Sequence, residues 1–254
     1  MAILQCELRG DSIRRDTSLV VILPQDKFRN KDPAAVLYLL HGRRQNAQAW
    51  MRYSRIESYA EKYNIAVVMP EVQLSFYNDM RHGGAFFTYI TQELPDLSGK
   101  MFHIPVEPER TYVAGLSMGG YGTLRCIFNR PDLYAGGASF SAVTDIHWRL
   151  RETRETDPGY RDLQAVFGAM PEADASEDLF SPSAPVFKTS RRPKLYISCG
   201  ISDARYEQNV RLSEFLKEQG YNHEFQEWPG DHDWDFWDLS IQKALGFFFG
   251  DPVS

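Results

Sequence analysis

The segment Gly115-Leu116-Ser117-Met118-Gly119 constrains the fold of this chain more than any other stretch. The β-branched and apolar run Thr111–Ala114 precedes it and predicts a buried strand. Tyr121–Asn129 follows it, with apolar residues at helical spacing, and predicts a helix that ends before a proline. The glycines around the serine allow strand and helix to approach closely. Strand, tight turn and helix are the setting of a serine nucleophile, which we expect Ser117 to be. The alternative is a glycine-rich turn with a bystander serine.

The pattern along the chain predicts an α/β fold. Val36–Leu40 and Ile65–Met69 are continuously apolar, as expected of strands covered on both faces. Ile3–Leu8 and Leu19–Leu23 indicate an antiparallel opening to the same sheet. Strands and helices then alternate, which predicts a mostly parallel, doubly wound sheet flanked by helices in one domain, 1–254. The later elements are expected at Ala85–Leu94 (helix, ending at Pro95), Gly136–Phe140 (strand), Lys194–Ser198 (strand), Val210–Gln219 (helix), Glu224–Trp228 (strand) and Trp237–Phe249 (helix).

Residues 145–192 differ in character from the rest of the chain, because they are rich in Asp, Glu, Arg and Pro. A helix is expected at Ile146–Thr153. We interpret the segment as a small insertion over the sheet edge, which either forms a partial lid or is a solvated surface excursion.

The composition argues against several classes of partner. The net charge is −6 and no block of Lys and Arg occurs, which disfavours nucleic acid and anionic membrane surfaces. No apolar run reaches the ~18 residues that a membrane span needs. Cys6, Cys126 and Cys199 are odd in number and widely spaced, which argues against a disulfide framework. With no signal peptide visible at the start of the chain, we expect a cytoplasmic protein.

A serine nucleophile needs a histidine base and an acid that orients it. Asp203 follows the expected strand Lys194–Ser198 and is our candidate acid, although it could instead cap the next helix. Only two histidines follow Asp203 along the chain, as the order serine, acid, histidine requires. His223 begins a strand and is expected to be an ordinary surface or packing residue. His232 lies in a loop before the last helix and is our candidate base.

Two further features of the site can be argued from the residues. Asp231-His232-Asp233 could suggest a metal site, but one histidine between two adjacent carboxylates converges poorly on an ion, so no metal is expected. The tetrahedral intermediate needs backbone N–H donors. One is expected from Met118, and the other from His41-Gly42-Arg43, where His41 would turn the loop and not serve as a second base.

With these residues in place, the sequence resembles the esterase D-like branch of the α/β-hydrolases, which includes tributyrin, feruloyl and acetyl esterases, S-formylglutathione hydrolases and mycolyltransferases. The resemblance implies the α/β-hydrolase fold and a cofactor-free serine hydrolase that forms an acyl-enzyme. It implies Ser117, Asp203 and His232 as catalytic triad, and the backbone amides of Arg43 and Met118 as oxyanion hole. The matching stretches are Leu39-Leu40-His41-Gly42, Glu93-Leu94-Pro95, 115–122, Cys199-Gly200 with Asp203, and 228–234.

The leading hypothesis for function is a carboxylesterase that hydrolyses short acyl or aryl esters, such as acetyl, butyryl or feruloyl esters. An S-formylglutathione-type thioesterase or an acyltransferase would use the same residues, so the motifs do not separate these alternatives. A non-catalytic binding module is disfavoured, because no member of the triad is missing. The expected partner is a small ester, and a homo-oligomer stays open.

The substrate pocket is the least constrained part of the hypothesis. The segment 75–80 resembles the acyl-site loop of the intracellular esterases of the branch. Aromatic side chains could line an aryl pocket or simply pack in the core; they are Phe76, Tyr77, Phe86, Trp148 and Trp234. Arg43-Arg44 stands where small or apolar residues are frequent in the branch, and either is solvated or meets an anionic group of the substrate. The candidate substrate-binding residues are His41, Gly42, Tyr77, His82 and Trp234.

Overall fold

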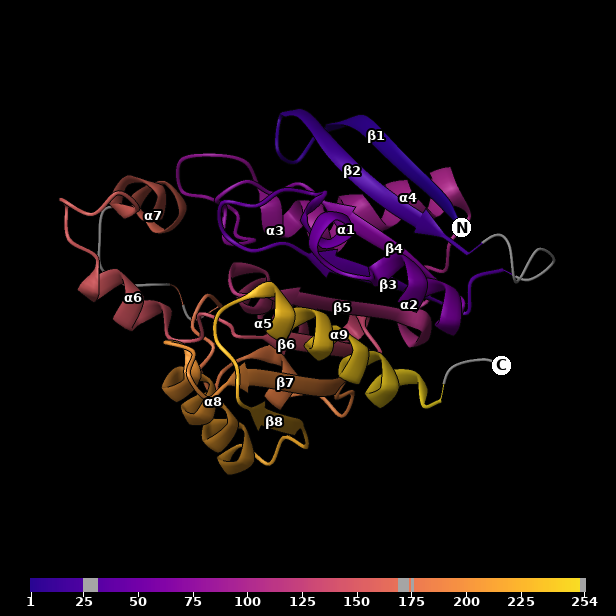
Figure 1. The fold of residues 1–254 in the computed structure, drawn as a ribbon. Coiled ribbons are helices and arrows are strands. Elements are labelled where there is room, and N and C mark those ends of the chain that lie inside the picture. The colour runs from indigo at the N-terminus through magenta and orange to yellow at the C-terminus, as the bar shows by residue number, and fades with distance from the viewer. Residues whose placement is uncertain (25–31, 169–173, 175, 252–254) are drawn as a thin grey trace.

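The computed structural model describes residues 1–24, 32–168, 174 and 176–251. They build an 8-stranded sheet with the strand order β1-β2-β4-β3-β5-β6-β7-β8, covered by helices on both faces (Figure 1). The strands are β1 (Ala2–Gly10), β2 (Arg15–Leu23), β3 (Ala35–Leu40), β4 (Ile65–Pro70), β5 (Thr111–Leu116), β6 (Gly136–Phe140), β7 (Lys194–Gly200) and β8 (Glu224–Trp228). The helices are α1 (Ala49–Tyr53), α2 (Ile56–Tyr63), α3 (Phe86–Thr88), α4 (Leu94–Phe102), α5 (Met118–Asn129), α6 (Ile146–Glu152), α7 (Tyr160–Phe167), α8 (Tyr206–Glu218) and α9 (Trp234–Phe249).

The sheet has the mixed character expected from the sequence. β1 pairs with β2, and β2 with β4, in antiparallel register. The pairs from β4 through β3, β5, β6 and β7 to β8 are all parallel. The prediction of a mostly parallel sheet with an antiparallel opening is confirmed.

Central strand β3 shows how the two halves of the core are separated. Val36, Tyr38 and Leu40 pack into one apolar cluster, with side chains of α5 and α8. The alternate residues of the strand pack into a second cluster, with side chains of α2 and α9. Successive side chains of a strand point to opposite faces, so the clusters lie on opposite sides of the sheet. The sheet is therefore doubly wound, as expected.

No helix in the described ranges is long and apolar enough to cross a membrane.

The turn at Ser117 is tighter than the sequence suggests. β5 ends at Leu116 and α5 begins at Met118, three residues before the expected start at Tyr121. Ser117 alone makes the turn, with φ 53° and ψ −112°, a conformation that a residue with a side chain rarely adopts. The apolar spacing used for the prediction begins only at Tyr121, and the glycines before it have low helix propensity, which the close packing of the helix on the sheet overrides.

A second correction concerns the helix expected to end at Pro95. The chain instead passes from α3 through a π-helical turn, Tyr89–Glu93, directly into α4. The N–H of Leu94 donates to the carbonyl of Tyr89, five residues back. Pro95 lies in the first turn of α4, immediately after the π-helical turn, where the spacing of the helical hydrogen bonds changes. The proline therefore continues the helix instead of ending it.

The insertion 145–192 lies between β6 and β7, which are neighbours in the sheet. Its helices α6 and α7 extend beyond the carboxyl ends of the parallel strands, at the left of Figure 1, and not along edge strand β8. The expected helix at Ile146–Thr153 is confirmed as α6, whose first turn is capped by the Asp145 carboxylate. α7 was not predicted from the sequence. Residues 169–173 and 175 of the insertion lie outside the described residues.

The packing of α5 on β3 leads to a prediction about Gly119. A Cβ atom there would overlap the carbonyl oxygen of Leu40 and lie 2.8 Å from that of His41. We expect Gly119→Ala to lower the free energy of unfolding by about 2 kcal/mol or more, because backbone must move. Urea denaturation measures the change.

The matched control is Gly246→Ala in α9, where the nearest atom to a new Cβ is the Tyr63 hydroxyl at 3.9 Å. Alanine is the better helix former, so this variant should be unchanged or more stable by up to about 1 kcal/mol. Equal effects of the two substitutions would contradict the packing argument.

Candidate active site

Ser117, His232 and Asp203 lie in one hydrogen-bonded line. The Oγ of Ser117 is 3.1 Å from Nε2 of His232, and Nδ1 of His232 is 2.8 Å from Oδ2 of Asp203. The serine follows β5, the aspartate follows β7 and the histidine follows β8. All three strands are parallel, so their carboxyl ends meet at one edge of the sheet and bring together residues that are up to 115 positions apart.

Asp203 is placed to hold His232 in one tautomer. Its side chain is 0% exposed. Burial raises the pKa of this carboxyl, but the hydrogen bond and charge of His232 and the N–H of Arg205 outweigh burial and leave the pKa below its usual value. The ionised carboxylate accepts a hydrogen bond from the Nδ1–H of His232, which leaves the Nε2 lone pair of the ring directed at Ser117. Asp203 also accepts from the Arg205 N–H at 2.8 Å, just before α8, so its second oxygen serves the local turn.

Two backbone N–H groups beside Ser117 have no acceptor in the part of the chain that the structure describes. They belong to Met118 and Arg43, the donors expected from the sequence. Their neighbours are occupied: Ser117 donates to the Phe140 carbonyl at 2.8 Å, and Gly42 donates to Oε1 of Gln45 at 2.9 Å. Ser117, Met118, Arg43 and His232 line the same pocket. The arrangement suits an anionic oxygen that develops next to the serine.

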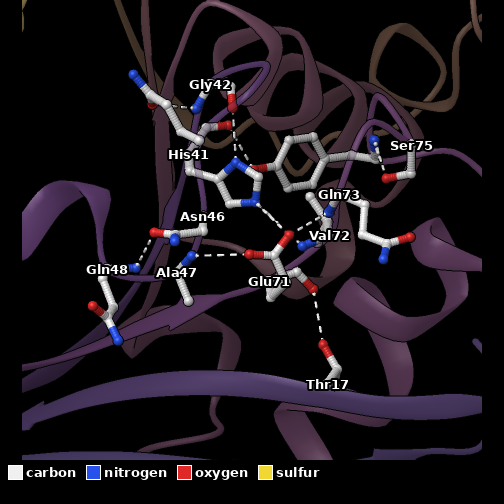
Figure 2. A network of polar contacts seen from close by, with 12 residues as sticks. Thr17, His41, Gly42, Asn46, Ala47, Gln48, Glu71, Val72, Gln73 and Ser75 are labelled. Carbon is white, nitrogen blue, oxygen red and sulfur yellow. Dashed lines mark hydrogen bonds and ion pairs between the residues drawn. The ribbon is translucent and has the colours of Figure 1, made fainter. Parts of the chain in front are cut away.

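The loop that carries Arg43 is held by a buried polar network around His41 (Figure 2). Nε2 of His41 accepts from the Val72 N–H at 3.2 Å, and Nδ1 is 2.8 Å from the Gly42 carbonyl. An acceptor at Nε2 requires the proton at Nδ1, so the ring is neutral and donates to Gly42. Burial lowers the pKa of His41, against the opposing charge of Glu71. The expectation that His41 turns the loop agrees with these contacts.

Glu71 connects this loop to the end of β4. One carboxylate oxygen accepts from the Ala47 N–H at 3.2 Å and the other from the Gln73 N–H at 2.7 Å (Figure 2). The backbone carbonyl of Glu71 accepts from the Thr17 hydroxyl at 3.2 Å. The carboxylate is also 3.6 Å from Nε2 of His41. These contacts join three segments to the loop that carries Arg43. The side chains of Thr17, His41 and Glu71 do not line the pocket at Ser117.

The cavity at Ser117 has a volume of about 320 Å³. Phe76 supplies its only aromatic ring among the lining residues, while Tyr77 and Phe86 are buried in the core. The sequence reasoning missed three lining residues, Val143, Arg149 and Arg205. Each follows the carboxyl end of a parallel strand within about ten residues, and that position was the available signal. The lining residues are Arg43, Arg44, Phe76, Ser117, Met118, Val143, Arg149, Arg205 and His232.

The five residues expected to bind substrate do not line this cavity. Four of them pack against other parts of the protein: His41 and Gly42 are buried within the loop, Tyr77 donates its hydroxyl to the His41 carbonyl at 2.8 Å, and the ring of Trp234 packs edge-on against Trp50. The fifth, His82, is exposed, and its N–H pairs with the Ala165 carbonyl. The described residues contain no group of three His, Cys, Asp or Glu side chains that could hold a metal.

The neutral state of His41 generates a prediction about pH. In the unfolded chain a histidine takes up a proton below about pH 6.5, whereas burial keeps native His41 neutral. The unfolded state then binds more protons, so stability rises with pH through this range and is lost as the pH falls. His41→Asn should reduce the slope of unfolding free energy against pH by up to about 1.4 kcal/mol per unit.

Urea denaturation at several values between pH 5 and pH 8 measures this slope. His82→Gln, which replaces an exposed histidine, is the control and should keep the wild-type slope. An unchanged slope in His41→Asn would show that native His41 takes up the proton.

Comparison with known proteins agrees with this geometry. The model of the family described as "Putative esterase" matches residues 10–248. An acetyl esterase of Caldicellulosiruptor saccharolyticus is 31% identical over 258 residues, which cover 96% of this chain and 97% of that protein. The fluorophosphonate-binding serine hydrolase F of Staphylococcus aureus, solved with substrate bound, is 30% identical with a TM-score of 0.88, over 98% of this chain and 99% of the other.

An S-formylglutathione hydrolase from the same bacterium is 30% identical with a TM-score of 0.85, over 98% of each chain. These proteins lie in the esterase D-like branch that the sequence resembles, and their fold is the α/β-hydrolase fold. Because the family model spans nearly the whole length, this chain belongs to the esterase family.

Proposed function

We propose that the protein is a serine carboxylesterase that hydrolyses short acyl or aryl esters through an acyl-enzyme on Ser117. The observation that carries the proposal is the line from Ser117 through His232 to Asp203, next to two backbone N–H groups without acceptors. The 31% identity to an acetyl esterase and the 30% identity to a serine hydrolase support the same reaction class.

The proposed reaction follows from the hydrogen bonds. The Oγ of Ser117 attacks the carbonyl carbon of the ester while its proton passes to Nε2 of His232. The carbonyl oxygen becomes negative and accepts hydrogen bonds from the N–H groups of Met118 and Arg43. The intermediate collapses, the carbon–oxygen bond to the alcohol breaks, and His232 returns the proton to the leaving oxygen. Water then attacks the acyl carbon and gives a proton to His232. The bond between the acyl carbon and the Oγ of Ser117 breaks, Ser117 regains the proton and the carboxylic acid is released. Asp203 stabilises the imidazolium in both halves.

The insertion 145–192 fits the role of a partial lid in this proposal. Arg149 of α6 lines the cavity at Ser117. Asp162 of α7 accepts a hydrogen bond from the Arg43 guanidinium at 2.8 Å, which links the insertion to the oxyanion loop. A segment with these two contacts would cover part of the substrate and limit its size.

Two alternatives use the same residues. A thioester would be hydrolysed by the same steps, and the 30% identity to an S-formylglutathione hydrolase favours testing one. An acyltransferase would differ only in the acceptor that attacks the acyl-enzyme.

The three cysteines are unpaired, which supports the cytoplasm as the location of the enzyme.

The central prediction concerns Ser117→Ala. Removal of the nucleophile should lower kcat/KM by ~10³-fold or more, because triad members act as a unit. The measurement is the initial rate with 4-nitrophenyl acetate, butyrate and octanoate, methyl ferulate and S-formylglutathione. A strong preference for the last would move the assignment to the thioesterase alternative.

Ser202→Ala replaces an exposed serine next to Asp203 and should keep wild-type rates. A fluorophosphonate should add one adduct to the wild-type protein, located at Ser117 by mass spectrometry, and none there to Ser117→Ala. Rates for Ser117→Ala within tenfold of wild type would overturn the proposed function.

A further inference from the structure

The cavity at Ser117 is strongly positive within an acidic protein. The chain as a whole has a net charge of −6. Of the nine residues that line the cavity, four are arginines and none is Asp or Glu. A neutral ester requires no such charge. The arginines come from two separate parts of the chain besides the oxyanion loop, so local sequence bias does not account for their meeting; they are Arg43, Arg44, Arg149 and Arg205.

The four guanidinium groups are unequally paired. Arg43 forms an ion pair with Asp162 at 2.8 Å, but its buried Nε has no hydrogen-bond partner. The Arg43 guanidinium is therefore paired with the Asp162 carboxylate, an arrangement that neither of the two alternatives from the sequence included. Arg44, Arg149 and Arg205 form no ion pair with any carboxylate in the described ranges. Three cations with free donors therefore face the cavity.

The half-buried Arg149 sits in an unfavourable environment for a cation. Burial lowers the pKa of Arg149, and the charges of Arg205 and Arg43 lower it further, while Asp157 opposes them. The nearby carboxylates have other partners. Asp157 accepts from the Arg154 N–H at 2.8 Å. Asp203, next to Arg205, is bound to His232. A free anion in the cavity would relieve the repulsion between these arginines.

We propose that the physiological substrate carries, besides its ester, an anionic group that Arg149 and Arg205 bind, with Arg44 at the cavity mouth. A carboxylate and a phosphate share the required chemistry, because the planar guanidinium donates two parallel hydrogen bonds to either. The inference rests on the proposed function and narrows its substrate class from short esters to esters with a nearby negative charge. The insertion then determines specificity, since α6 supplies Arg149.

The test uses pairs of esters that differ in charge. The monoester of adipic acid with 4-nitrophenol, compared with 4-nitrophenyl hexanoate, places the charge on the acyl side. 4-Acetoxybenzoate, compared with its methyl ester, places it on the leaving group. For each pair the ratio of kcat/KM, charged over neutral, is measured in the wild type, Arg149→Gln and Arg205→Gln. The ratio removes effects of a variant on folding or on the chemical step.

The control is Arg151→Gln, an exposed arginine on the same helix as Arg149 that does not line the cavity. We expect the ratio of one pair to fall about tenfold in both cavity variants and to stay at the wild-type value in the control, because each variant removes a charge-assisted hydrogen bond. The pair that responds identifies the side of the ester on which the anion lies. Raising the salt concentration should lower the wild-type ratio as well.

Benzoate and phenyl phosphate, used as competitive inhibitors of neutral ester hydrolysis, distinguish a carboxylate site from a phosphate site by the tighter inhibition constant. Ratios that are equal within twofold in all four proteins, with inhibition by neither anion, overturn the anion site while neutral turnover still supports the esterase. Absence of turnover of all four esters by the wild type would instead overturn the proposed function itself.

Discussion

The close approach of α5 to the end of β3 at Gly119 is the contact on which the rest of the site depends. The first turn of α5 lies against the carbonyl oxygens of Leu40 and His41, at the end of β3. Nearby, a Cβ on Gly42 would lie 2.5 Å from the side chain of Leu116. The turn that strains Ser117 and the loop that carries Arg43 are therefore packed on each other. The proposed nucleophile and the proposed oxyanion donors are positioned by one contact, and a shift in either segment would move both.

A buried polar network also holds the loop that carries Arg43. The His41 ring and the Glu71 carboxylate contact backbone groups of the loop after β3 and of the segment that follows β4 (Figure 2). From β2, the Thr17 hydroxyl donates to the backbone carbonyl of Glu71. A buried polar group without partners would be costly, and here each contact satisfies one. The network keeps the loop in a single conformation, so the Arg43 N–H is oriented before a substrate arrives. Preorganised donors of this kind stabilise charge without reorganisation during the reaction.

The charge of the cavity at Ser117 is opposite in sign to the net charge of the chain. An acidic chain places four arginines around the cavity at Ser117, and the insertion contributes to the arrangement in two ways. α6 supplies Arg149, and α7 supplies Asp162, which pairs with Arg43. The insertion is thus the part of the molecule that distinguishes this cavity from a neutral, apolar one, while the sheet and the elbow supply the reactive groups.

The three hydrogen-bonded residues Ser117, His232 and Asp203 could be predicted from the sequence alone. Ser117 and Asp203 each follow a largely apolar run that forms a buried strand, and His232 follows the edge strand β8. Parallel strands bring their carboxyl ends together. The doubly wound sheet followed from the same runs. The proposed donor of Met118 followed from its place after Ser117, whereas the choice of Arg43 within the loop after β3 came from the family resemblance.

Only the tertiary structure decided the rest. The helix passes Pro95 because a π-helical turn shifts the proline into the first turn of α4, and α5 starts at Met118 because packing overrides the weak helix propensity of glycine. Tyr77 is buried in the core and Trp234 packs against Trp50, while Arg149 and Arg205 line the cavity. The direction of a side chain at the end of a strand depends on contacts with segments distant in sequence. No local pattern records those contacts, so the sequence determined the reactive groups and the tertiary structure determined the cavity around them.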